Sequence, residues 1–175
     1  GIASARPALD AIAAARSHAD VARLLASPAF GTLSPRGGVD PGLTAPIVVD
    51  VTIDQKNPDR YVLSVTHGGL GLPDREFYLR EDEQFATIRA KYREHLERAL
   101  ALAGDPAPAA GASAVLALET EIARLHWPVA KRRERELTYN LRTRAELEQV
   151  APGYPWSAAL ESAGLTGQDA FVGRE

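Results

Sequence analysis

Four histidines are the side chains in this sequence that most invite a search for metal chemistry: His18, His67, His95 and His126. Helical zinc hydrolases place two histidines one helical turn apart, with a glutamate beside the first, so that the ligands converge on the metal. No such pair occurs here. In His95-Leu96-Glu97 and in Glu119-Thr120-Glu121, residues two positions apart point to different faces of a helix. The sequence therefore predicts no metal ligand in this chain.

Nucleophile and phosphate-binding patterns are also missing. Ser64 precedes Thr66-His67 at the end of a strand-like run, without the flanking glycines of a strand-to-helix elbow. Gly68-Gly69-Leu70-Gly71 suggests a phosphate loop, but no G-x-G-x-x-G or G-x-x-x-x-G-K-[ST] pattern follows. We predict no catalytic residue, and no substrate-binding residue can be named.

A run of charged residues, Lys131-Arg132-Arg133-Glu134-Arg135-Glu136, is the third candidate. Arginine binds anions in pairs of hydrogen bonds, but acid and base alternate here. A solvated face or local ion pairs are favoured over an anion site. The net charge of −3 and the pI near 5.9 argue against nucleic acid as a partner.

Most of the chain has sequence patterns that are typical of helices, and these helices must position the residues named above. Apolar spacing predicts a short helix over 7–16, and Ser17-x-x-Asp20 resembles a capping box that opens another through Leu25. Glycine and proline make 27–46 a long connecting loop. The longest helix is predicted over about 82–103, ended by Gly104.

Further helices are expected in the second half. One follows Pro106 and Pro108, carries Val115, Leu118, Ile122 and Leu125 on its apolar stripe, and forms an antiparallel pair with the long helix. It ends before Pro128. Thr143-x-x-Glu146 is a capping-box pattern for a short helix to 150, and Pro155-Trp156 opens a last helix ended by Gly164.

One β-hairpin is expected at about 47–66. Apolar residues alternate from Ile47 to Ile53 and again from Tyr61 to Val65, and 55–59, centred on Asn57-Pro58-Asp59, has turn chemistry. An isolated hairpin is marginally stable, so it must pack on helices or join other strands. The fold class predicted is mainly α, with amphipathic helices packed as part of a helical lobe and this single hairpin.

The stretch 68–79 has a local explanation as well as a distinctive sequence. Its glycines permit unusual backbone angles, Pro73 and Asp74 suit the start of a helical turn, and Phe77 and Tyr78 would hold that turn against the core. Structure alone accounts for these residue types.

Several strings nevertheless resemble, in the same order, the motifs of the neprilysin and endothelin-converting-enzyme family of zinc metallopeptidases. They are Leu70-Gly71-Leu72-Pro73-Asp74-Arg75-Glu76-Phe77-Tyr78, Asp54-Gln55-Lys56-Asn57-Pro58, Leu118-Glu119-Thr120-Glu121-Ile122-Ala123, Arg133-Glu134-Arg135-Glu136-Leu137-Thr138-Tyr139-Asn140 and Pro155-Trp156. The chain has no cysteine, which departs from the disulfide-rich animal members and is similar to the bacterial branch.

The resemblance implies that residues 1–175 are a fragment of the N-terminal helical, non-catalytic domain, without the catalytic zinc domain. In such enzymes zinc polarises the scissile carbonyl and activates water, with a glutamate as general base. The helical lobe encloses the active-site cavity and limits substrates to oligopeptides. The implied partners are the catalytic domain of the same polypeptide and oligopeptide substrates, and the zinc belongs to the parent enzyme.

An alternative is a free-standing helical module, related to that lobe, which binds a protein partner through the hairpin edge. A lobe cut from its neighbours would expose apolar surface, so self-association is also expected. No apolar run is long enough to span a bilayer, and 1–15 lacks the features of a signal peptide. Composition fits periplasm and cytosol, and the resemblance favours the periplasm or cell envelope.

Overall fold

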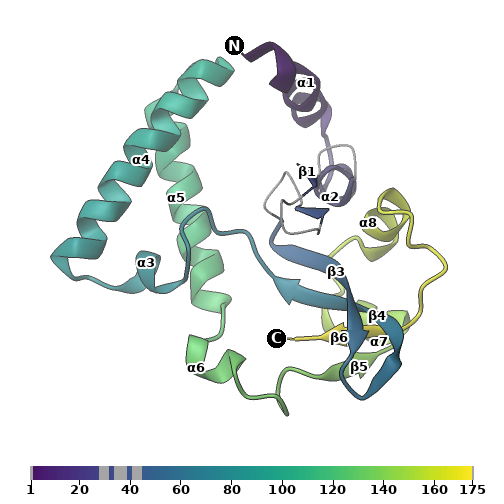
Figure 1. Cartoon of the computed structure of the whole chain (residues 1–175). Coiled ribbons are helices and arrows are strands. Elements are labelled where there is room, and N and C mark those ends of the chain that lie inside the picture. The colour runs from purple at the N-terminus through teal and green to yellow at the C-terminus, as the bar shows by residue number, and fades with distance from the viewer. Residues whose placement is uncertain (1, 28–31, 34–38, 41–44, 175) are drawn as a thin grey trace. The chain divides into compact units, whose positions relative to one another are not determined.

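The computed structural model describes residues 2–27, 32–33, 39–40 and 45–174. The chain forms two compact units (Figure 1), here called the helical unit (1–6 and 69–128) and the sheet unit (7–68 and 129–175). The architecture is mainly α with a small sheet, which confirms the predicted class. Among the described helices, none has the length and hydropathy needed to cross a membrane.

The helical unit contains the 3-10 turn η1 (Ile2–Ala5) and the helices α3 (Glu76–Leu79), α4 (Glu83–Ala103) and α5 (Pro108–Leu125). Helix α4 ends at Gly104, whose φ of 92° lies in the left-handed region that glycine adopts without a steric penalty. Helix α5 begins with Pro108, which needs no hydrogen bond at a first-turn position. Helices α4 and α5 pack against each other, and α3 packs on both, which confirms the predicted helix pair.

Burial in the helical unit is shallow. No residue of α4 is buried, and in α5 only Ala112 and Ala123 are. Val115 and Ile122 are half-buried as the apolar stripe predicts, but Leu118 and Leu125 are 62% and 82% exposed. Only half of the predicted apolar stripe is covered, because α5 packs through Ala112, Glu119 and Ala123.

The sheet unit contains the helices α1 (Arg6–Ala14, after its first residue), α2 (His18–Ala26), α6 (Val129–Arg132), α7 (Arg144–Val150) and α8 (Trp156–Ser162). Its main strands are β3 (Ile47–Asp54), β4 (Asn57–His67), β5 (Asn140–Arg142) and β6 (Phe171–Gly173). A separate pair, β1 (Thr32–Leu33) and β2 (Val39–Asp40), interrupts the predicted 27–46 loop, most of which lies outside the described residues.

The sheet has the strand order β3-β4-β6-β5 (Figure 1). Strands β3 and β4 form the predicted hairpin, and β6 lies parallel to β4 and antiparallel to β5. The hairpin thus joins strands from within the chain. Helices α7 and α8 supply Leu147, Trp156 and Leu160, which form a core with Leu63 and Phe171 on one face of the sheet.

The hairpin turn is tighter than predicted. Asp54 pairs with Asn57, so Gln55 and Lys56 make the turn, and Asn57-Pro58-Asp59 already belong to β4. The strand register shifts between Ile53 and Asp54. Pro58, which has no N–H to donate, lies in the irregularly paired stretch that this shift creates. The physical reason is the Asp54 carboxylate, which accepts the Lys56 N–H at 2.9 Å and closes the turn early.

Candidate functional site

A three-residue hydrogen-bond network joins the stretch 68–79 to α4 and α5. The hydroxyl of Tyr78, which is buried, donates to Glu119 Oε2 at 2.7 Å and accepts the Leu72 N–H at 2.8 Å. Tyr92 of α4 donates its hydroxyl to the other oxygen of Glu119 at 3.0 Å. One carboxylate therefore ties together the loop, α3, α4 and α5.

The two tyrosines of this network are hydrogen-bond donors and not bases. Burial, with the Glu119 carboxylate as the next cause, raises the pKa of Tyr78 above its ordinary value. Burial and the same carboxylate raise the pKa of Tyr92 to about 12. Both hydroxyls keep their protons at neutral pH, so the two tyrosines position elements of the helical unit and do not act as bases.

Gly71 is the glycine that this network requires. A Cβ at this position would lie 2.0 Å from Tyr92 Oη and 3.2 Å from Glu119 Oε1. Nearby, Arg75 donates from Nε to the Ala123 carbonyl at 3.3 Å and pairs with Glu76 at 2.9 Å. Residues of the Leu70–Tyr78 string and of the Leu118–Ala123 string thus contact each other directly.

A second network surrounds Asp54 in the sheet unit. Asp54 is 1% exposed, and its Oδ2 accepts Arg60 Nε at 2.7 Å and lies 2.6 Å from Arg60 Nη2. Its Oδ1 accepts the Tyr139 hydroxyl at 2.8 Å and the Lys56 N–H. The Lys56 ammonium also lies 4.4 Å from the centroid of the Tyr139 ring.

The Asp54 carboxylate is stabilised in its charged form. The Lys56 N–H, then the Tyr139 and Arg60 hydrogen bonds, lower the pKa of Asp54 to about 2 against the opposing effect of desolvation. The hairpin turn and the Thr138-Tyr139-Asn140 segment are thereby fixed to each other. This network, too, positions backbone segments.

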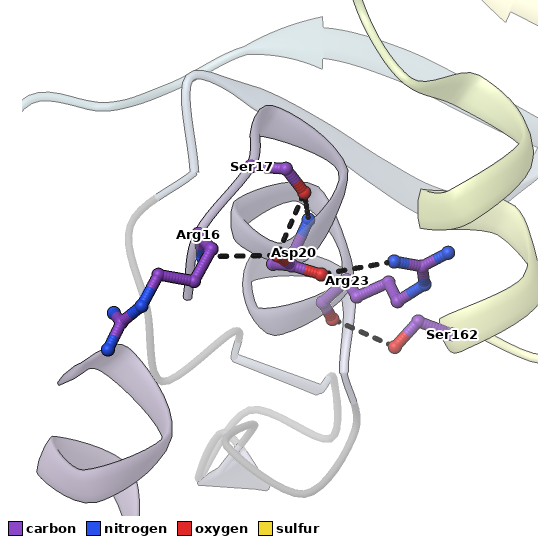
Figure 2. A network of polar contacts seen from close by, with 5 residues as sticks. All are labelled: Arg16, Ser17, Asp20, Arg23 and Ser162. Carbon is purple, nitrogen blue, oxygen red and sulfur yellow. Dashed lines mark hydrogen bonds and ion pairs between the residues drawn. The ribbon is translucent and has the colours of Figure 1, made fainter. Parts of the chain in front are cut away.

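A third network joins α2 to α8 (Figure 2). Asp20 Oδ2 accepts the Arg16 N–H at 3.1 Å and the Ser17 hydroxyl at 2.8 Å, while Ser17 Oγ accepts the Asp20 N–H. Arg23 bonds Asp20 Oδ1 at 3.3 Å, and Ser162 of α8 donates to the Arg23 carbonyl at 2.8 Å. Ser17 therefore caps α2 as predicted, and the cap helps to seat α8.

The four histidines and Ser64 do not come together in one site. His18 and His95 are exposed, His67 is half-buried and His126 is buried. Among the described residues, no group of three His, Cys, Asp or Glu side chains is arranged to hold a metal ion. Ser64 is buried in β4, away from any glycine elbow, because its strand continues to His67. These residues therefore do not fit a zinc site.

The charged run 131–136 and the glycines from Gly68 to Gly71 are explained by their places in the fold. Lys131 and Arg132 end the short helix α6, and the four residues 133–136 are exposed, as a solvated face requires. No phosphate-binding arrangement is needed to explain the glycines, because the Gly68 N–H bonds to the Pro46 carbonyl at 2.9 Å. A Cβ on Gly68 would meet the Ala45 carbonyl oxygen at 2.5 Å.

A pocket of about 420 Å³ lies in the sheet unit, between β3, the end of α2, and α8. Its lining is mainly apolar and includes Leu25, Val49, Trp156 and Leu160. Asp50 also lines it, but its Oδ1 already accepts the Val51 N–H at 2.8 Å. Such a lining can bury a hydrophobic group.

Comparison with known proteins identifies the family of the chain that contains these networks. Residues 1–174 match the profile of peptidase family M13, in the part that forms its N-terminal domain. The chain belongs to that family. Endothelin-converting enzyme 1 of Cavia porcellus is 36% identical over 116 residues, and human endothelin-converting enzyme-like 1 is 34% identical over 115 residues. These alignments cover 65% and 63% of the M13 chain, and 15% of each relative.

Solved structures of a bacterial relative agree with the family assignment. The zinc metalloprotease Zmp1 of Mycobacterium tuberculosis in complex with an inhibitor has a TM-score of 0.85 and 31% identity. Its open state gives 0.83 and the same identity. The comparison covers 99% of the M13 chain but only 25% and 26% of the Zmp1 chains. The chain thus spans a small part of the relatives that it matches.

In this chain, four of the five family strings contact one another in two pairs. The predicted resemblance was confirmed, but the sequence did not reveal the contacts between the strings: Tyr78 and Tyr92 share Glu119, and Tyr139 contacts Asp54. Tyr92 is the member that motif reasoning missed. Its signal in the sequence is its helical spacing from Ile88 and Leu96, which indicates packing without showing a hydrogen-bond partner.

Proposed function

We propose that residues 1–175 serve as part of the non-catalytic N-terminal lobe of a zinc metallopeptidase, which encloses the active-site cavity and limits substrates to oligopeptides. The observation that carries this proposal is the M13 match over 1–174 together with the 0.85 TM-score to the zinc metalloprotease Zmp1. The described residues offer no metal-binding group, so the zinc would be held by residues outside this chain.

The polar networks support a positioning role. The Glu119 and Asp54 networks each tie segments that are distant in the sequence through hydrogen bonds to one carboxylate. A wall that excludes large substrates has to keep its shape, because size selection depends on a fixed entrance. The networks around Glu119 and Asp54 supply such rigidity within each unit.

The polypeptide that contains the lobe, and its location in the cell, are also proposals. We propose that residues 1–175 are a fragment of the N-terminal helical domain, and that the zinc domain of the same polypeptide is its partner. The proposed location, on the family resemblance alone, is the periplasm or cell envelope.

The test uses the product of the whole open reading frame that encodes these residues. We expect it to hydrolyse a short unstructured peptide and to leave the same sequence intact when that sequence lies inside a folded protein. A zinc chelator should abolish the hydrolysis, and residues 1–175 alone should show none. Equal cleavage of the peptide and the folded protein would contradict the size limit. An open reading frame that ends at Glu175 would favour the free-standing binding module.

A further inference from the structure

The apolar face of the hairpin is covered at one end and open at the other. Ile53 pairs with Tyr61 and Val51 pairs with Leu63, so these side chains lie on the same face of the sheet. Leu63 is buried in the core, whereas Val51, Ile53 and Tyr61 are 58%, 51% and 75% exposed. We call these three exposed residues the hairpin patch.

The other face of the same hairpin end is already occupied. Val62 and Asp54 are 5% and 1% exposed, and Asp54 is bonded to Arg60 and Tyr139. The hairpin end is therefore fixed by polar contacts on one face and presents aliphatic and aromatic side chains on the other. Because this end is held in place, the patch is a preformed surface that a partner could bury without ordering the strands.

The hairpin patch is continuous with an apolar surface that already serves as an interface. Val51 also lines the pocket between β3 and α8, beside Val49 and Leu160. Helices α7 and α8 cover this sheet face around Leu63 and Phe171. A second covering element next to α8 would extend the same sheet–helix packing over the patch.

We propose that the hairpin patch is the surface on which a segment of the same M13 polypeptide, from outside residues 1–175, packs. Over 99% of its length, the chain matches only 25% of the Zmp1 chain, so this relative carries much additional fold of the kind that would cover the patch. The occupant must be apolar, because the patch offers no charged group. The inference rests on the proposed function, since both require a longer polypeptide.

Single cysteines provide the test, because residues 1–175 contain none. Ile53→Cys and Tyr61→Cys place thiols on the patch. Leu141→Cys is the matched control, since Leu141 is an apolar strand residue, 48% exposed, whose pairing with Val172 sets it on the opposite face from Phe171. Each variant is made in the whole open-reading-frame product and in residues 1–175, and a maleimide reports the accessibility of the thiol.

We expect the patch thiols to react about tenfold more slowly in the whole product than in residues 1–175, because they react only when the covering segment opens. The Leu141→Cys thiol should react at similar rates in both. Hydroxyl-radical footprinting of Tyr61 in the unsubstituted proteins should show the same protection, which removes any effect of the substitutions.

Equal patch reactivity in the two proteins would overturn the inference, as would equal protection of the Leu141→Cys thiol. Protection that develops in residues 1–175 as their concentration rises would also overturn it, because a second copy would then be the occupant. Peptidase activity of the same whole product is measured alongside. An active product with an exposed patch refutes this surface and leaves the proposed function standing, whereas an inactive product counts against the proposed function itself.

Discussion

Individual residues in the family strings act through the groups they touch, and Gly71 is the clearest case. Its hydrogen faces the Tyr92 hydroxyl at a distance that no Cβ could occupy. The glycine is therefore needed for close approach and not for an unusual backbone angle, because its φ is not positive. Conservative changes at this position are expected to disturb the Tyr78–Glu119–Tyr92 network.

Gly71→Ala should lower the free energy of unfolding by about 1–3 kcal/mol, since an extra methyl group forces its neighbours apart in a packed site. Gly153→Ala is the control, because a Cβ there meets nothing within 4 Å. Urea unfolding followed by circular dichroism measures both. Adding Tyr92→Phe to Gly71→Ala removes the nearest clashing atom, so the two changes together should cost less than their sum. Equal stability of the Gly71→Ala and Gly153→Ala proteins would contradict this account.

Asp54→Asn should destabilise the sheet unit, because an amide cannot accept the Arg60, Tyr139 and Lys56 hydrogen bonds with the strength of a carboxylate. The effect has a defined pH dependence. The pKa of Asp54 is lower in the folded chain, about 2, than its ordinary value of 3.8. Its contribution to stability is thus present above pH 3.8 and is lost as the pH falls towards about 2.

Thermal unfolding of the wild-type and Asp54→Asn proteins across that range checks the prediction. The difference between their melting temperatures should be largest near neutral pH and should shrink as the pH falls. Asp59→Asn is the control, since Asp59 is an exposed aspartate of the same hairpin. A difference that does not depend on pH would show that the Asp54 charge is unimportant.

At the scale of elements, the sequence correctly predicted helix ends where a single residue type decides the local geometry. The caps at Ser17 and Thr143, the left-handed glycines at 104 and 164, and Pro108 at the start of α5 all lie where their chemistry predicts. The hairpin was predicted from its alternation. Its turn was displaced because the Asp54 side chain, and not the Asn57-Pro58-Asp59 sequence, sets where the chain reverses.

Two strands of the four-stranded sheet could not be predicted, because their pairing is not local. Strands β5 and β6 have three residues each, too few for an alternation to be recognised. Strand β6 pairs with β4 in parallel from more than a hundred residues away, as in Leu63 with Phe171. The hydrogen bonds between family strings are hidden for the same reason, since Tyr78 and Glu119 are 41 residues apart.

Thr143→Ala should cost about 1 kcal/mol of stability, because the hydroxyl accepts the Glu146 N–H and caps α7. Helix α7 carries the buried Leu147 into the core, so fraying of its first turn weakens the sheet unit. Thr166→Ala at an exposed loop position is the control. Chemical denaturation compares the two variants, and an unchanged midpoint for Thr143→Ala would show that the capping box is dispensable.

At the scale of the whole molecule, the sheet unit is assembled from both ends of its sequence. Strands β3 and β4 come from the first half, and β5 and β6 come from the second, with the helical unit's residues 69–128 inserted between them. The sheet can therefore close only after nearly all of the chain is available. Such non-local pairing is slow to form and depends on its last strand.

Removal of residues 171–175 should abolish the cooperative folding of the sheet unit. Strand β6 lies between β4 and β5, so its loss leaves β5 without a strand partner and removes Phe171, which is 0% exposed, from the core. Phe171→Ala alone should cost about 3–5 kcal/mol. The matched control lacks only residue 175 and keeps the Arg174 N–H, which bonds to the Val65 carbonyl at 3.0 Å. Circular dichroism during urea unfolding separates the cases: a truncated chain that unfolds like the control would show that β6 is peripheral, whereas loss of the transition would place the stability of the sheet unit in its final strand.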